Sequence, residues 1–214
     1  MENILAPKVE ALYQAIMELF KEGADINNLT VAEIAKKAGI GKGTVYEYFG
    51  NKEEMIAEAI FHHTKQACQR MSDKLKTVKS LHERMNLFLV TMDEEMSDIR
   101  CFIRVLQIML DNSAISSRLR ELVTSRDKSE ILIEELVREV IGDGIESGGE
   151  KEGAEAYLEM VAFSRIICYA LYQFKAKERT DIDTTAMREA ICSDICRDVE
   201  NFRAQKQKSG SLAG

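Results

Sequence analysis

The sequence predicts an all-α protein of about nine helices, and three observations lead to this. Apolar residues recur along most of the chain at the three- and four-residue spacing of amphipathic helices, and no segment alternates as a half-buried strand does. A single proline, Pro7, occurs among 214 residues, and helix-forming residues are frequent. The composition, 45% hydrophobic and 30% charged, is that of a globular protein.

The first three expected helices are closely spaced. Apolar positions over residues 8–22 form one stripe, which predicts an amphipathic helix. Thr30 and Glu33 have the spacing of a capping box, so a second helix of about two turns begins there. Gly39 ends it, because glycine adopts the left-handed conformation that stops helices. A third short helix covers residues 42–49.

Longer helices are expected after residue 50. Asn51 provides the N-cap of a helix that continues to about residue 74. The later amphipathic segments are 79–96, 98–111, 115–141, 151–177 and 184–203. The glycine-rich stretch 142–149 is a connection, since it lacks the Gly-Lys-Ser/Thr of a phosphate loop. The expected organisation is a first domain over 1–50, a second, helical domain over 51–205, and a disordered tail over 206–214.

Two short helices joined by a tight glycine turn indicate a helix-turn-helix. Val45 and Phe49, four residues apart, hold the third helix against the core. The opposite face carries cationic, hydroxyl and aromatic side chains that can reach base edges and phosphates in a major groove. These residues are Lys42, Thr44, Tyr46, Glu47 and Tyr48. The alternative for Tyr46 and Tyr48 is a place in the core. Double-stranded DNA is the partner that this surface predicts.

The charge distribution limits how DNA is bound. A net charge of −7 argues against indiscriminate coating of nucleic acid and against an anionic membrane as partner. Residues 36–52 nevertheless carry four lysines against one glutamate, Glu47. Lys52 lies in the first turn of a helix, where a cation opposes the helix dipole, so a phosphate partner is reasonable there. The alternative is a solvated lysine.

The stretch TVAEIAKKAGIGKGTVYEYFGNKEEM, from Thr30 to Met55, resembles the N-terminal domain of the TetR (tetracycline-repressor-like) family. The resemblance covers about residues 8–62. It implies that helices one to three bind DNA, that helix four links them to a ligand domain, and that the last two helices pair in a homodimer. By position, the groove-facing residues are Lys42, Gly43, Thr44, Tyr46 and Glu47, and the phosphate contacts are Thr30, Tyr48 and Lys52.

One departure from the family lies at Gly41, where a serine or another polar residue is common. Glycine can occupy an N-cap, but it offers no side-chain hydrogen bond. We expect one contact to DNA to be missing there.

The resemblance also implies a repressor that binds a palindromic operator and is released by a small molecule. Apolar side chains that could line a pocket, or simply fill the core, are Phe88, Met92, Phe102 and Met109. Arg104 and Gln107 could be polar anchors. An apolar or amphipathic effector is expected. The alternative is a DNA-binding protein that signals through a protein partner or without a ligand.

The last two helices carry apolar faces wide enough for burial on two sides, which supports a dimer independently. The expected interface residues are Phe174, Met187, Ile191, Ile195 and Val199.

No feature predicts an enzyme, a cofactor or a metal site. The chain shows no nucleophile–base pair and no cofactor loop. Cys192 and Cys196, one helical turn apart, fit a helix seam better than a zinc or redox site. Neither a leader sequence nor a membrane span is visible, so a cytoplasmic protein is expected.

Overall fold

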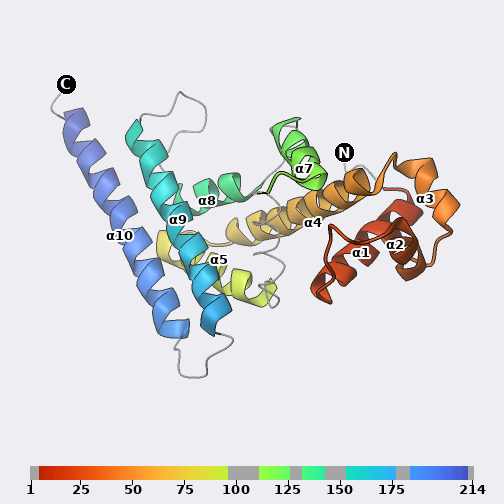
Figure 1. Ribbon diagram of the computed structural model, residues 1–214. Coiled ribbons are helices and arrows are strands. Elements are labelled where there is room, and N and C mark those ends of the chain that lie inside the picture. The colour runs from red at the N-terminus through yellow and green to blue at the C-terminus, as the bar shows by residue number, and fades with distance from the viewer. Residues whose placement is uncertain (1–4, 96–110, 126–131, 143–152, 177–183, 212–214) are drawn as a thin grey trace. The chain divides into compact units, whose positions relative to one another are not determined.

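The computed structural model describes residues 5–95, 111–125, 132–142, 153–176 and 184–211 (Figure 1). All regular secondary structure in these ranges is helical, so the all-α prediction is confirmed. The described helices are α1 (Pro7–Lys21), α2 (Val31–Lys37), α3 (Lys42–Tyr48), α4 (Lys52–Leu75), α5 (Leu81–Glu95), α7 (Ala114–Ser125), α8 (Ile133–Ile141), α9 (Gly153–Ala176) and α10 (Thr184–Ser211).

The chain forms two compact units. The first comprises residues within 1–67 and 100–130, and the second comprises residues within 68–99 and 131–214. Helix α4 is continuous and contributes to both. The sequence-based division after residue 50 therefore differs from the packing, which keeps the first turns of α4, and α7, with the helix-turn-helix.

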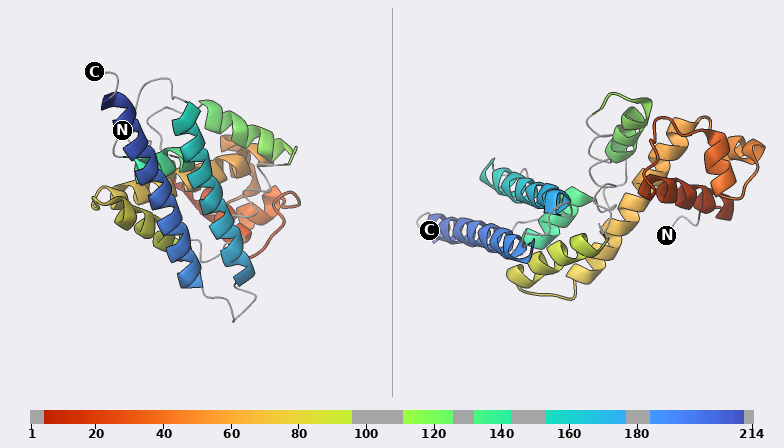
Figure 2. Two further views of the ribbon diagram at one scale, coloured as in Figure 1. Left: turned by 90° about the vertical axis from the view of Figure 1, so that its left-hand side faces the viewer. Right: turned by 60° about the horizontal axis from the view of Figure 1, so that its bottom comes forward.

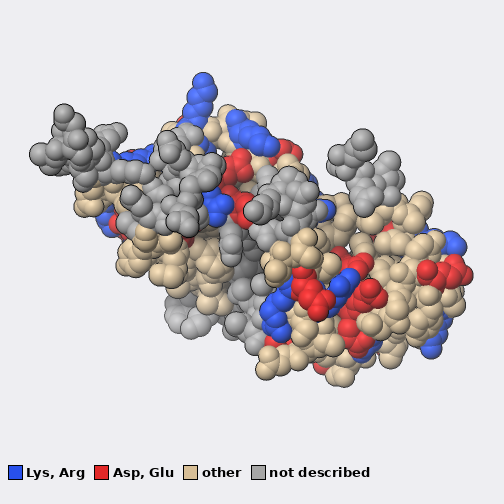
Figure 3. Space-filling view, turned by 90° about the horizontal axis from the view of Figure 1, so that it is seen from above, with Lys and Arg blue, Asp and Glu red and all other residues tan. Residues whose placement is uncertain are grey.

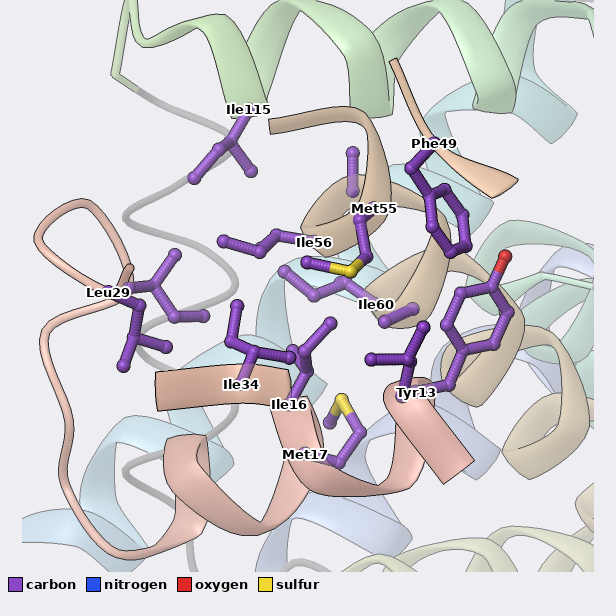
Figure 4. Packing of buried hydrophobic residues seen from close by; sticks show 14 of the residues in the cluster. Tyr13, Ile16, Met17, Leu29, Ile34, Phe49, Met55, Ile56, Ile60 and Ile115 are labelled. Atoms are coloured by element: carbon purple, nitrogen blue, oxygen red, sulfur yellow. The ribbon is translucent and has the colours of Figure 1, made fainter. Parts of the chain in front are cut away.

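The core of the first unit is built from α1, α2, α3, α4 and α7. Figure 4 shows Ile16 of α1, Ile34 of α2 and Ile60 of α4 converging, with Ile115 pointing in from α7. All four side chains are at most 1% exposed. Burial of such side chains stabilises the unit by roughly 1.5–3 kcal/mol each, which fixes α2 and α3 on α1 and α4.

The core of the second unit lies among the C-terminal end of α4, α5, α8, α9 and α10. Helix α10 packs on α5 and α9, and the views of Figure 2 show α9 and α10 side by side. Leu89 of α5, Val140 of α8 and Tyr169 of α9 are completely buried. Arg203 of α10 donates to the carbonyl oxygen of Ile141 at 2.7 Å and so caps the end of α8.

Two expected boundaries differ from the structure. The predicted helix 115–141 contains two helices, α7 and α8, because their apolar faces are buried in different units: Ile115 in the first and Val140 in the second. The predicted tail from residue 206 is helical as far as Ser211, since alanine, glutamine and lysine follow Arg203 and the first glycine comes at Gly210. The predicted helix 98–111 lies almost entirely outside the described residues.

The described helices include none that is both long enough and apolar enough to cross a membrane.

Candidate nucleic-acid interface

The predicted capping box at the start of α2 is present. Thr30 Oγ1 accepts a hydrogen bond from the Glu33 backbone N–H at 3.2 Å. Glu33 Oε2 accepts in return from the Thr30 N–H at 2.8 Å and from its hydroxyl at 2.7 Å. These bonds lower the pKa of Glu33, because they stabilise its ionised form. The cap fixes where α2 begins.

The turn between α2 and α3 is a Schellman motif. The Ile40 N–H donates to the Ala35 carbonyl at 2.9 Å, and the Gly39 N–H donates to the Lys36 carbonyl at 3.2 Å. Gly39 has a φ of +69°, which favours glycine over residues with a Cβ. Half-buried Ile40 packs on the first core and holds the turn in place.

The two faces of α3 differ as the sequence predicts. Val45 and Phe49 are buried, at 1% and 5% exposure. Tyr46 and Tyr48 are exposed, at 53% and 42%, so neither is a core aromatic. Lys42, Gly43 and Glu47 are also exposed, and Thr44 is half-buried. The groove-facing set therefore shares one accessible surface, and its contacts to bases remain predictions.

The start of α3 is open. Gly41 is its N-cap and makes no side-chain capping bond, as its residue type implies. A Cβ at Gly41 or Gly43 would meet no atom within 4 Å, so folding does not require glycine at either position. The two glycines leave the first turn of α3 without side-chain bulk, which permits close approach of its backbone to a ligand.

Two predicted phosphate contacts already have partners in the protein. Lys52 Nζ donates to the carbonyl oxygens of Asn27 and Leu29, at 2.7 and 3.0 Å. It therefore holds the α1–α2 connection against the start of α4. An ammonium has three donors, so one is left for a phosphate, which would compete with Glu53 Oε1 at 3.9 Å from the Lys52 Nζ. The hydroxyl and N–H of Thr30 both donate to Glu33, so Thr30 would need to turn its hydroxyl to donate to DNA.

The helix that follows is also capped as expected. Asn51 Oδ1 accepts from the Glu54 N–H at 2.8 Å, and Glu54 Oε2 accepts from the Gly50 N–H at 2.9 Å. Asn51 thereby defines the beginning of α4, next to Lys52.

Charge around this surface is mixed. Lys37 pairs with Glu22 at 2.6 Å and with Glu18 at 3.5 Å, whereas Lys36 and Lys42 are exposed. Acidic and basic side chains are interspersed on the face drawn in Figure 3. Any attraction for DNA is therefore local to α3 and its flanks.

The structure moves three predicted interface residues into a core. Ile191, Ile195 and Val199 are at most 7% exposed within the second unit. Their four-residue spacing marks a buried face, but it does not say that a second chain buries it. Half-buried Met187 packs on the same core, and the side chain of Phe174 lies outside the described set.

Helix α9 instead exposes large apolar residues. Tyr157 is 64% exposed, Met160 57% and Leu171 43%. Exposed apolar side chains gathered on one helix mark an interaction surface. The sequence predicts a wide apolar face for this helix, but periodicity alone does not separate its exposed residues from its core residues.

The predicted ligand residues are only partly described. Phe88 is 5% exposed in the second core, and half-buried Met92 packs against that core. Phe102, Arg104, Gln107 and Met109 lie outside the described residues.

The described cysteines support a structural interpretation of the α10 pair. Cys192 and Cys196 are buried, and burial raises the pKa of both thiols, that of Cys196 to about 12. Within the described ranges, no three His, Cys, Asp or Glu side chains are grouped as metal ligands.

Sequence reasoning missed the contribution of α7 to this unit. Arg118 of α7 lies 3.2 Å from Glu58 and 3.7 Å from Glu54 of α4. The spacing of Ile115 and Leu119 predicts an apolar face but not its partner, so no local signal could have revealed this contact.

Comparisons with known proteins agree with the helix-turn-helix. Residues 12–59 match the family model for bacterial regulatory proteins of the tetR family. A fatty acid metabolism regulator protein of Bacillus subtilis is 27% identical over 152 residues, which are 71% of this chain and 75% of the relative. The uncharacterized HTH-type transcriptional regulator YhgD of the same organism is 29% identical over 57% of this chain and 61% of its own.

Solved structures share the fold. FadR of Bacillus subtilis, in complex with stearoyl-CoA, superposes with a TM-score of 0.65 at 20% identity, over 87% of this chain and 97% of that one. A transcriptional regulator from Pseudomonas aeruginosa has a TM-score of 0.67 at 16% identity, over 92% and 93% of the two chains.

Proposed function

Because the chain belongs to the TetR family of bacterial transcriptional regulators, we propose that it represses transcription by binding a palindromic operator as a homodimer and is released by a fatty acyl-CoA. The observation that carries the DNA-binding part is the exposed face of α3. Tyr46 is exposed one turn after Lys42, and Tyr48 is exposed at the end of the helix, while Val45 and Phe49 are buried on the opposite side.

That face has the chemistry for reading a major groove. The lysine can donate to guanine, the threonine hydroxyl can donate or accept, and the tyrosines combine ring contact with a phenolic hydroxyl. A dimer would place two such helices about one DNA turn apart, roughly 34–36 Å, on a palindromic site.

The effector part rests on similarity together with the apolar second unit. A stearoyl-CoA complex is known for the Bacillus subtilis FadR that shares this fold. An acyl-CoA is amphipathic, which matches the kind of effector that the Met- and Phe-rich helices predict. Phe88 and Met92 lie on α5, in and against the core of the second unit, and we propose this apolar unit as the place where the acyl chain binds.

Helix α4 gives the two units a shared element. It comprises 24 residues and spans about 36 Å at 1.5 Å per residue. A ligand that prefers a conformation with the wrong separation of the two DNA-binding surfaces weakens DNA binding by its differential affinity for the two states.

The dimer interface is proposed on the exposed face of α9, around Tyr157, Met160 and Leu171. In a two-fold dimer each of these residues appears twice, so one modest apolar patch becomes a self-complementary surface.

The wild-type protein is first used to select a DNA duplex from random sequences. Fluorescence anisotropy then measures binding to this duplex and tests the proposal. We expect stearoyl-CoA, but not free CoA, to weaken binding, and saturating duplex to weaken stearoyl-CoA binding by the same factor. Lys42→Ala and Tyr46→Ala should each cost roughly 1–3 kcal/mol on the selected duplex and less on random DNA. Lys79→Ala, an exposed lysine in the second unit, is the matched control.

Equal losses on selected and random DNA would contradict base reading by α3. Selective binding that stearoyl-CoA leaves unchanged would contradict the acyl-CoA part and keep the DNA-binding part.

A further inference from the structure

We infer that Arg118 of α7 is a positioning residue for α3: it acts through Glu58 and Tyr13 on Phe49, the residue that ends α3. Arg118 lies 60 residues from Glu58 along the chain and outside the helix-turn-helix. The path joins α7, α4, α1 and the end of α3 in three consecutive contacts.

The first contact fixes α7 on α4. Ile115 and Leu119 of α7 are 1% and 4% exposed in the core of the first unit. Arg118 directly precedes Leu119 and lies about one turn after Ile115 on the same helix. Its Nη2 donates to Glu58 Oε1 at 3.2 Å. The apolar contact sets the distance between the helices, and the ion pair sets their register.

The second contact turns Glu58 into a bridge. While Oε1 accepts from Arg118, Oε2 accepts from the Tyr13 hydroxyl at 3.1 Å. An ionised carboxylate only accepts, so the tyrosine must be the donor. Burial and the Glu58 charge raise the pKa of Tyr13 well above its usual range, which keeps the donor proton in place.

The third contact reaches α3. The Tyr13 and Phe49 rings lie 6.0 Å apart between centroids and are tilted by 45° (Figure 4). Phe49 is the C-cap of α3, and its N–H donates to the Val45 carbonyl at 3.1 Å. A Tyr13 ring held at its hydroxyl therefore fixes the side chain that ends α3.

Arg118 also balances a local excess of acid. It lies 3.7 Å from Glu54 and 3.2 Å from Glu121, in addition to Glu58. Without it, Glu54 and Glu58 would stand one turn apart on α4 with like charges, which is destabilising. Glu58 would then be drawn away from the position in which it holds Tyr13.

The place of α7 in the chain gives this contact a consequence for regulation. Segments of the second unit precede and follow residues 100–130 in the sequence. The order of α3 thus depends on a helix within a segment, residues 100–130, that the chain joins at both ends to the second unit. This consequence rests on the proposed function, whereas the positioning role does not.

Hydrogen–deuterium exchange of the DNA-free protein tests the positioning role directly. Arg118→Ala should reduce the protection of peptides covering residues 42–49 by about three- to tenfold, the effect of losing one partly exposed charged hydrogen bond. Arg120→Ala is the matched control, because Arg120 bonds to Ser116 and Ser117 of α7 and to the carbonyl oxygen of Asp111, and none of these residues lies on the path through Glu58, Tyr13 and Phe49. This substitution should leave the protection of residues 42–49 from exchange unchanged.

A double-mutant cycle with Tyr13→Phe then tests the path. Tyr13→Phe keeps the ring on Phe49 but removes the hydroxyl that Glu58 holds, so Arg118→Ala should have little further effect on 42–49 in that background. An equal loss of protection in both backgrounds would overturn the inference, as would protection that Arg118→Ala leaves unchanged.

If Arg118→Ala does not fold, Arg118→Lys serves instead, since it retains the charge but not the fork that spans Glu58 and Glu121. The double-mutant cycle of Arg118→Ala and Tyr13→Phe is then repeated with binding to the selected duplex as the measured quantity. A wild-type protein that selects no duplex would refute the proposed function, while the exchange result would still decide the positioning role.

Discussion

Replacing Leu171 by glutamate should convert the proposed dimer into a folded monomer, whereas the same substitution at Ile191 should unfold the second unit. Leu171 is 43% exposed on α9, and Ile191 is 7% exposed in the core on α10. The two positions lie on the two helices that the family resemblance assigns to dimerisation. One substitution therefore distinguishes a residue that faces a partner from a residue that faces its own core.

The exposed fractions set the magnitudes. Full burial of a leucine is worth roughly 1.5–3 kcal/mol, so the 43% of Leu171 that remains exposed can contribute roughly 1 kcal/mol per subunit on dimerisation. Both subunits lose it in a two-fold interface, which raises the dimer Kd by about 30-fold before the desolvation of two carboxylates adds to the loss. At Ile191 the substitution removes a core side chain and buries a charge, a cost of several kcal/mol against a typical total stability of about 5–15 kcal/mol.

Sedimentation equilibrium gives the dimer Kd, and circular dichroism during urea titration gives the free energy of unfolding. We expect Leu171→Glu to sediment as a monomer at micromolar concentration with native helix content. A Leu171→Glu protein that dimerises as tightly as wild type would refute the α9 surface. A folded, monomeric Ile191→Glu protein would return the interface to α10.

Three further predictions concern local features. Gly39→Ala should lower the free energy of unfolding by about 1–2 kcal/mol, because φ is +69° and the added Cβ meets no atom within 4 Å; an unchanged value would contradict the Schellman turn. Lys52→Ala should lower stability by about 1 kcal/mol and reduce the slope of log K against log salt by about one; lower stability with an unchanged slope would leave Lys52 purely structural. In the Leu171→Glu variant, which leaves the α9 face open, iodoacetamide at pH 8 should label exposed Cys168 before buried Cys192 and Cys196, whose raised pKa values suppress the reactive thiolate; equal rates in mass spectrometry would contradict their burial.

The sequence predicts the helix-turn-helix well because its determinants are local. Thr30 and Glu33 are three residues apart and make the cap by themselves. Gly39 supplies the turn, and the four-residue spacing of Val45 and Phe49 orients α3. Each of these features depends on residues within about two helical turns, which is the range over which sequence patterns are informative.

Which segment buries each apolar helix face depends on residues distant in the sequence, so the local pattern does not predict it. Ile191 and Ile195 lie at the spacing of a helix face, but the face could be buried by α5 and α9 or by a second chain, and the structure has the former. The face of α7 around Ile115 is similar. The amphipathic pattern indicates that a helix face is buried. Which segment buries that face depends on how segments distant in the sequence pack together.

The same argument explains why the pattern of apolar residues could not identify a ligand site. Phe88 has the periodicity of a core residue, and a residue lining an apolar cavity has the same periodicity. Buried polar groups are what distinguish a pocket from a core, because they fix the orientation of a ligand. Among the described residues of the second unit, the buried polar side chains are Ser72, Arg84 and Thr91. Each occupies a helix position that hydrophobic periodicity would assign to an apolar residue. A search for residues that contact an effector should therefore begin at these three positions, where the sequence departs from the apolar pattern.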